Sequence, residues 1–410
     1  MSNIPARVAA LAIALLPVVG DAASMSLDQA LTRAVQRSAA ARAARAETAS
    51  ARQAARAAGQ LPDPAFSLGI DNLPVSGADR FSTTADSQTM KRIGISQEWV
   101  SRDKREARRA AADAAADRQA ATTDIAVADT RLQTALAYID AYYVGEALRF
   151  AMLDEHHADE ALAAAKARLA SSRGDAQDVL ALTAARGLAE DDSADVRQAQ
   201  ADASVGLQRW VGEPVDVLES PAMGQAPSEA AYVAASPAVR SARLEVDVAR
   251  REAAVAASER RPDWAWQVSY GQRSGYPDML SFGVSIPLPV ARAERQDRQV
   301  AARVALIETA EARLEEATRA AAAEYRALDN DAQRLARRIE RIRSAVVGPA
   351  RQRTEVALAG YRSTGTPLAT LFEARHAQVD AQRKLLALQR DLARTQARLV
   401  YGPVIEGVQP

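Results

Sequence analysis

Residues 264–270 read Trp-Ala-Trp-Gln-Val-Ser-Tyr, and residues 280–286 read Leu-Ser-Phe-Gly-Val-Ser-Ile. In both stretches a large apolar residue alternates with a small or polar one. Successive side chains of a β-strand point to opposite faces, so this period of two predicts two strands, each with one apolar face.

A second pair of such stretches lies earlier in the chain, within residues 65–99, where large apolar residues again alternate with serine and glycine. Three of the four tryptophans fall in these segments, and aromatic residues at strand ends are typical of outer-membrane strands. The alternative is two ordinary hairpins of a soluble sheet. We interpret the large residues as lipid-facing: Phe66, Leu68, Ile70, Ile93, Ile95, Trp264, Trp266, Val268, Tyr270, Leu280, Phe282, Val284 and Ile286.

Long helices follow each strand pair. Residues 105–171 contain no proline, and residues 291–362 are interrupted only near Gly348-Pro349 and at Gly360. At about 1.5 Å per residue, either helix reaches roughly 100 Å. Apolar residues recur at spacings of three and four along them, and in a last helix Leu371, Leu385, Leu392 and Leu399 share a seven-residue repeat. This pattern predicts coiled-coil packing.

The chain is predicted to be an internal duplication. The first repeat spans residues 23–212 and contains a helix over 27–58, the strand pair 65–99, a long helix and a return helix. A connector over 213–236 precedes the second repeat, 237–402, which has the same order with its strand pair at 264–287. Residues 403–410 form a tail. Each long helix ends at a glycine turn, at Gly174 and Gly365, from which a return helix is expected over 178–210 and 368–401.

Residues 1–22 are expected to be a secretory signal peptide, with Arg7 before an apolar stretch and small residues at the cleavage site. The sequence has no cysteine, which excludes disulfides, thiolate metal sites and a lipid-anchored N-terminal cysteine. Lysine plus arginine equals aspartate plus glutamate at 52 each, so net charge does not indicate nucleic acid as a partner.

No catalytic motif or phosphate-binding glycine loop is present, so we expect neither an enzyme nor a cofactor. The adjacent His156 and His157 lie on a predicted helix, where sequence neighbours point in different directions. We therefore expect no metal site there, and His376 has no predicted role. These features suit a passive conduit.

Several short motifs resemble those of the outer-membrane efflux protein family, the TolC-like channels. Residues 68–74 read Leu-Gly-Ile-Asp-Asn-Leu-Pro, residues 95–98 read Ile-Ser-Gln-Glu before Lys104-Arg105, residues 285–289 read Ser-Ile-Pro-Leu-Pro, and residues 361–365 read Tyr-Arg-Ser-Thr-Gly. Their order and spacing are similar to the heavy-metal branch, the cobalt–zinc–cadmium type of channel. The resemblance covers essentially the whole chain after the leader.

The resemblance implies a fold that is mainly α with a small β part. In that family three copies form a homotrimer, in which long coiled-coil helices make an α-barrel across the periplasm. Four strands per chain join a twelve-stranded transmembrane β-barrel in the outer membrane. It also implies two protein partners: a periplasmic adaptor that docks at Gly174 and Gly365, and an inner-membrane resistance–nodulation–division pump that drives export of divalent metal ions.

Many channels of this family carry acidic residues about two turns beyond the tip glycine, around the periplasmic entrance. Here Leu371 and Ala374 occupy two of those positions, so the residues carried over are Asp178 and Glu373. Charged residues on a solvated helix face are the alternative for both.

Two other functions stay open on the sequence. The cargo of such a channel is alternatively drugs or a secreted polypeptide. A protein of a different class, a periplasmic coiled-coil adaptor or scaffold without a barrel, also has long helices. It usually has only one helical hairpin, whereas this chain is predicted to have two.

Overall fold

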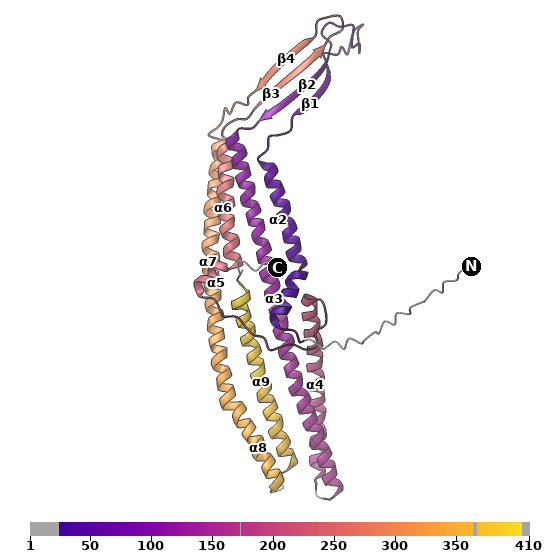
Figure 1. Cartoon of the computed structure of the whole chain (residues 1–410), viewed down its shortest axis with the longest axis vertical. Helices are drawn as coiled ribbons and strands as arrows, with labels where there is room; N and C mark the ends of the chain where they lie inside the picture. Colours follow the sequence, from indigo (N-terminus) through magenta and orange to yellow (C-terminus); the bar gives the residue numbers. More distant parts are fainter. Residues whose placement is uncertain (1–23, 173, 364–366, 404–410) are drawn as a thin grey trace, which may run out of the picture.

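The computed structural model describes residues 24–172, 174–363 and 367–403. The expected signal peptide and Gly365 lie outside these ranges. The molecule is elongated, with a small sheet at one end and helices along the rest of its length (Figure 1). Within the described residues, no helix combines the length and the apolar composition needed to cross a lipid bilayer.

One antiparallel sheet contains all four strands, in the order β1-β2-β3-β4. The strands are β1 (Ala65–Asp71), β2 (Met90–Trp99), β3 (Trp264–Gln272) and β4 (Met279–Ser285). β1 with β2 and β3 with β4 are the two predicted strand pairs, and β2 pairs with β3 along nine residue pairs. The two halves of the chain therefore meet in a single sheet, with β1 and β4 at its edges.

The first helix differs from the prediction of one continuous helix over 27–58. It is divided at Ser38 into α1 (Leu27–Arg37) and α2 (Ala39–Ala58). Ser38 leaves the helical conformation, with φ −56° and ψ 112°, and its hydroxyl accepts a hydrogen bond from the backbone N–H of Ala41 at 3.1 Å. Serine competes for backbone hydrogen bonds in this way, so it caps a new helix where the sequence pattern shows no break.

Two helical columns run the length of the helical region (Figure 1). The first is α3 (Arg102–Ala170), and the second is α7 (Gln296–Ile342), a π-helical turn over Arg343–Val347 and α8 (Gly348–Ser363). The expected interruption near Gly348-Pro349 is confirmed as this π turn, since proline lacks the N–H that a regular helix needs. The expected break at Gly360 is absent, because α8 continues through it.

The shorter helices lie beside these two columns, and together they form a single layer. The return helices are α4 (Ala176–Val211) and α9 (Leu368–Tyr401), and the second half begins with α6 (Pro237–Ser258). A helix that the sequence analysis missed, α5 (Glu229–Ala235), lies in the connector. The upper layer has the order α2-α3-α6-α7, and the lower layer has the order α4-α3-α9-α7/α8 (Figure 1).

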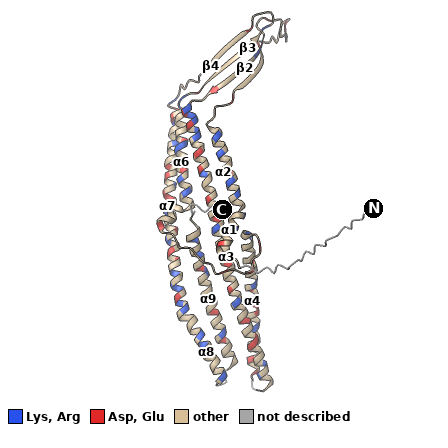
Figure 2. Ribbon diagram, in the orientation of Figure 1, with Lys and Arg blue, Asp and Glu red and all other residues tan. Residues whose placement is uncertain are grey.

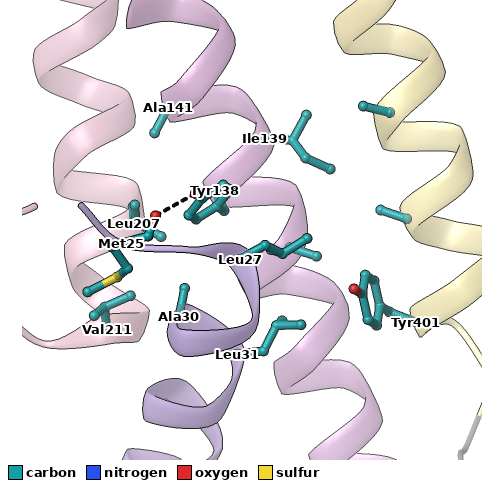
Figure 3. Packing of buried hydrophobic residues seen from close by; sticks show 13 residues of the cluster. Met25, Leu27, Ala30, Leu31, Tyr138, Ile139, Ala141, Leu207, Val211 and Tyr401 are labelled. Carbon is teal, nitrogen blue, oxygen red and sulfur yellow. Dashed lines mark hydrogen bonds between the residues drawn. The ribbon is translucent and has the colours of Figure 1, made fainter. Parts of the chain in front are cut away.

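The main hydrophobic core lies where the upper and lower helices meet (Figure 3). Fully buried Tyr138 of α3 donates its hydroxyl to the backbone carbonyls of Met25, at 2.6 Å, and Glu219, at 2.8 Å. Burial raises the pKa of Tyr138 to about 12. The side chain thereby ties the start of the described chain and the connector to α3.

A buried ion pair joins the helices to the sheet. Lys104, in the first turn of α3, is 4% exposed, and its Nζ lies 2.8 Å from Oδ2 of Asp263, the residue before β3. Oδ1 of Asp263 is buried without a hydrogen-bond partner in the described chain. The pair thus links the two halves of the molecule at the base of the sheet.

We expect Lys104→Met to destabilise the protein by about 3–5 kcal/mol, because the substitution leaves the Asp263 carboxylate buried and uncompensated. The double variant Lys104→Met/Asp263→Leu removes both charges and should recover most of this loss. Arg102→Met is the matched control, since Arg102 pairs with Glu106 in an exposed position, where such pairs contribute at most about 1 kcal/mol.

The midpoint of chemical unfolding of the purified protein measures all three variants. Equal losses for Lys104→Met and Arg102→Met would contradict the role of the buried pair.

Candidate functional site

The sheet has one strongly apolar face, built from the residues predicted to be lipid-facing. Directly paired residues of an antiparallel sheet share a face. The register places Phe66, Ile95, Val268 and Phe282 in one row across the four strands. In the neighbouring rows the same face carries Leu68, Ile93, Tyr270 and Leu280, and also Ile70, Trp266, Trp264 and Val284. Ile286 lies just beyond the end of β4.

These side chains are exposed to a degree that is unusual for their size. Leu68 is 77% exposed and Phe282 is 75% exposed. No helix of the described chain covers this face, because the helices begin below the sheet (Figure 1). A contiguous exposed apolar patch of this kind marks a surface that contacts a membrane or another protein.

The middle of the opposite face is small and polar. One row across it is Ser67, Gly94, Ser269 and Ser281. A Cβ atom at Gly94 would lie 2.9 Å from Oγ of Ser67 and 3.1 Å from Cβ of Ser269, so a larger residue there would require its neighbours to move. The side chains are crowded on this face, whereas those of the apolar face stand free.

Aromatic residues lie at both ends of the apolar face. At the helix end, the rings of Trp99 and Trp264 are 5.9 Å apart. At the other end, exposed Tyr276 and Phe81 lie in the loops, each with an arginine side chain over its ring. The nine residues of β3 extend for about 30 Å at the usual rise per residue. With the strand tilt of about 40° found in membrane barrels, they would span about 23 Å, close to the height of the apolar band in such proteins.

The helical layer has two open edges, which we name by their helices. The α2/α4 edge consists of α2 above and α4 below, and both pack mainly against α3. The α7/α8 edge lies on the other side of the layer, and α7 buries only Ala310, Ala321, Leu335 and Ile339. Both edges expose large apolar residues: Leu188 of α4 is 73% exposed and Val356 of α8 is 72% exposed.

At the lower end of the molecule, the turn between α3 and α4 requires glycine at position 174. A Cβ atom there would lie 2.7 Å from the backbone nitrogen of Leu169. Asp178 lies half-buried in the first turn of α4, and Glu373 is exposed on α9. In the described residues neither acid forms an ion pair.

Leu371 and Ala374, the positions at which the family resemblance would place acids, are buried. Leu371 packs in a hydrophobic cluster with residues of α3 and α4. A carboxylate at either position would lose its hydration, so Leu371 and Ala374 suit core positions.

The structure gives His376 a partner that the sequence did not reveal. Nδ1 of His376 on α9 lies 2.6 Å from Oδ2 of Asp154 on α3, a carboxylate that is almost fully buried. His157 is partly buried, while His156 pairs with Glu160 one turn away. Sequence spacing alone could not show that Asp154 and His376, 222 residues apart, lie side by side. In the described ranges no cluster of three or more histidines and carboxylates could hold a metal ion.

Comparison with solved structures shows the fold. The outer membrane protein VceC from Vibrio cholerae is 18% identical, with a TM-score of 0.75 over 93% of this chain and 97% of VceC. The open state of the MtrE outer membrane channel from Neisseria gonorrhoeae is 16% identical, with a TM-score of 0.74 over 92% and 88%. CusC, described for its transmembrane channel formation, is 15% identical, with a TM-score of 0.73 over 93% and 92%.

No family model matches the sequence, and no curated protein does. The structural matches nevertheless cover nearly all of both chains. The predicted fold class, mainly helical with a small part of four strands and similar to TolC-like channels, is therefore confirmed.

We expect protonation of His157 in mild acid to lower the free energy of unfolding of the protein. Burial, and secondarily the charge of Arg375, lowers the pKa of His157, so the unfolded chain takes up a proton on this residue before the folded chain does. The stability that neutral His157 provides is thus present above about pH 6.5 and declines as the pH falls below it. His157→Gln should make stability less dependent on pH between 7 and 5.

Chemical unfolding of the wild type, His157→Gln and the exposed control His156→Gln at each pH measures this effect. A His157→Gln variant with the same pH dependence as the wild type would refute the assignment.

Proposed function

We propose that the chain is the outer-membrane channel subunit of a tripartite efflux system, and not an enzyme. The observation that carries the proposal is the sheet: an apolar face of membrane-band height opposite a small polar face, with aromatic residues at both ends. Lipid is the environment that suits the first face, and water suits the second. A soluble sheet would need a core against its apolar face.

The edges of the sheet suggest how the channel closes. β1 and β4 each have one side without a strand partner in the described chain. Unpaired backbone groups are not tolerated in the hydrocarbon region of a membrane, so spanning strands form closed barrels. Three copies that pair β1 of one with β4 of the next would give twelve strands, and the crowded glycine and serine face would turn inwards.

The helices would continue this channel into the periplasm. A layer with two open edges closes into a tube when three copies meet edge to edge. Arginine, glutamate, aspartate and glutamine along the helices suit a water-filled lumen. The tube would be a passive conduit, with energy supplied by an inner-membrane pump of the resistance–nodulation–division kind.

We further propose that the cargo is a divalent heavy-metal ion. Support comes from the motifs similar to the cobalt–zinc–cadmium branch, residues 68–74, 95–98, 285–289 and 361–365. A periplasmic adaptor would dock at Gly174 and Gly365. Asp178 and Glu373 are the proposed entrance acids, since Asp178 lies near the Gly174 turn and Glu373 lies near the start of α9.

Phe282→Arg should prevent assembly in the outer membrane, because an arginine on the lipid face near the middle of the band costs about 2–4 kcal/mol. Phe282 is largely exposed in the single chain, so the substitution causes no steric clash there. Ser281→Arg is the matched control, with the same new charge one residue away on the polar face. Fractionation of cells and heat-modifiable migration of the trimer measure assembly. Equal assembly of both variants, or a soluble wild-type monomer, would refute the channel.

The same variants test the cargo when they are expressed in a strain that lacks the gene. Loss of the gene should sensitise cells to zinc, cobalt, cadmium or copper, and the wild-type gene and Ser281→Arg should restore growth while Phe282→Arg should not. Sensitivity to hydrophobic drugs alone would retain the channel and reject the metal cargo.

A further inference from the structure

In the lower half of the helical layer the two open edges carry opposite charges: α4 is acidic, and the lower part of α7 with α8 is basic (Figure 2). We infer that this charge complementarity fixes the register in which copies of the chain assemble. Acidic α4 of one copy faces the basic lower part of α7 of the next. The inference rests on the proposed trimeric channel and adds the residues that align its subunits.

The lower part of the α2/α4 edge is acidic. Leu182, Ala189 and Ser193 mark the side of α4 that is buried in the subunit. At 100° per residue, Asp191 lies about 200° around the helix from Ala189 and so points away from α3. Asp195 flanks the same outward line. Neither carboxylate has an ion-pair partner among the residues that the structure describes.

One further acid continues this outward line. Asp202 lies eleven residues beyond Asp191, which is about three helical turns. It accepts a hydrogen bond from the neutral side chain of Gln198, at 3.0 Å. Three carboxylates on one exposed line therefore have no cationic partner among the described residues.

The lower part of the α7/α8 edge is basic. Leu335 and Ile339 are the residues of α7 that pack on α9. Arg337 lies midway between them in sequence, so it points to the opposite side of the helix. Arg341 lies one turn further along and flanks this outward line. In the described ranges, neither guanidinium has a carboxylate partner.

The acidic and basic groups lie at the same height. The two helical hairpins end at one level (Figure 1). Nη2 of Arg383 on α9 lies 3.1 Å from Oδ1 of Asp192 on α4, so these two residues share a level. Leu385, two residues beyond Arg383, packs in one cluster with Ile339 and Ile342 of α7. Asp195 is thus level with Arg341, and Asp202 is level with the region of Arg337.

The upper half has a weaker difference in charge between its edges. α2 carries Arg42, Arg45, Arg52 and Arg56, none of which forms an ion pair in the described chain. The upper part of α7, residues 296–326, contains six carboxylates and five arginines, and Glu308 lacks an ion-pair partner in the described chain. Glu315 and Glu316 pair only with Arg319 of their own helix.

A chain of contacts across the layer relates the heights in the upper half. The hydroxyl of Thr48 on α2 donates to the carbonyl of Gln119 on α3, and the adjacent Arg118 pairs with Glu245 on α6. One and a half turns along α6, Arg250 pairs with Glu311 on α7. The arginines of α2 therefore lie at the level of the glutamates of α7.

We therefore expect another copy of this chain to pack against each edge, parallel to the first copy and at the same height. Rotation about the long axis brings α7 of one copy beside α2 and α4 of the next without changing their heights. A shift by half the helical length that brings the lower part of α7 beside α2 would place arginine beside arginine. Like charges in an interface suppress such arrangements.

A charge-exchange experiment on the full-length protein tests the register. One variant combines Arg337→Glu and Arg341→Glu, a second combines Asp195→Arg and Asp202→Arg, and a third has all four substitutions. Each of the first two should weaken the trimer about tenfold or more, because repulsion replaces attraction. The third should recover most of the loss, since the opposite charges face each other again. Arg149→Glu is the control, a charge reversal at an exposed pair within α3.

Native mass spectrometry or light scattering of the detergent-purified protein over a range of concentrations gives the trimer fraction. Recovery in the fourfold variant supports the inference. A trimeric wild type whose stability is unaffected by either reversal, or is not recovered in the fourfold variant, overturns the register while the channel stands. A monomeric wild type overturns the proposed channel itself.

Discussion

The whole arrangement depends on an apolar sheet face that the described chain leaves uncovered. The rows through Leu68 and Phe282 stand free of any helix, and β1 and β4 leave backbone groups unpaired at the edges of the sheet. Exposed apolar area and open strand edges both favour association in water. One environment removes both problems: a lipid phase around a sheet that has closed through further copies of the same chain.

The helices likewise leave much of their surface uncovered within the subunit. Because they are rich in alanine and form a layer one helix thick, they bury few large side chains, and α7 buries hardly any. A few specific contacts therefore hold the subunit together: the core around Tyr138 at mid-height and the Lys104–Asp263 pair below the sheet. The remaining apolar and charged groups of α4, α7 and α8 face outwards, where a neighbouring subunit would complete their packing.

Features that depend on local pattern were predictable from the sequence. The strand residues follow from period-two alternation, and the bounds of α9 from a leucine repeat between a glycine turn and Gly402. Two local features were missed, because Ser38 and Ser228 each cap a new helix, α2 and α5, without a break in the apolar pattern. Features that depend on partners distant in sequence were not predictable. The pairing of β2 with β3 and the contact between Asp154 and His376 join residues more than 150 positions apart.

Cysteine scanning of β3 tests the central claim most directly, because the chain has no cysteine of its own. Single cysteines at Val268 and Tyr270, and at the neighbouring Ser269 and Gly271, would be labelled in native membranes with one lipid-soluble and one water-soluble maleimide. The account predicts that the first two react from the lipid phase and the other two from the aqueous lumen. Equal aqueous labelling at all four positions would contradict it.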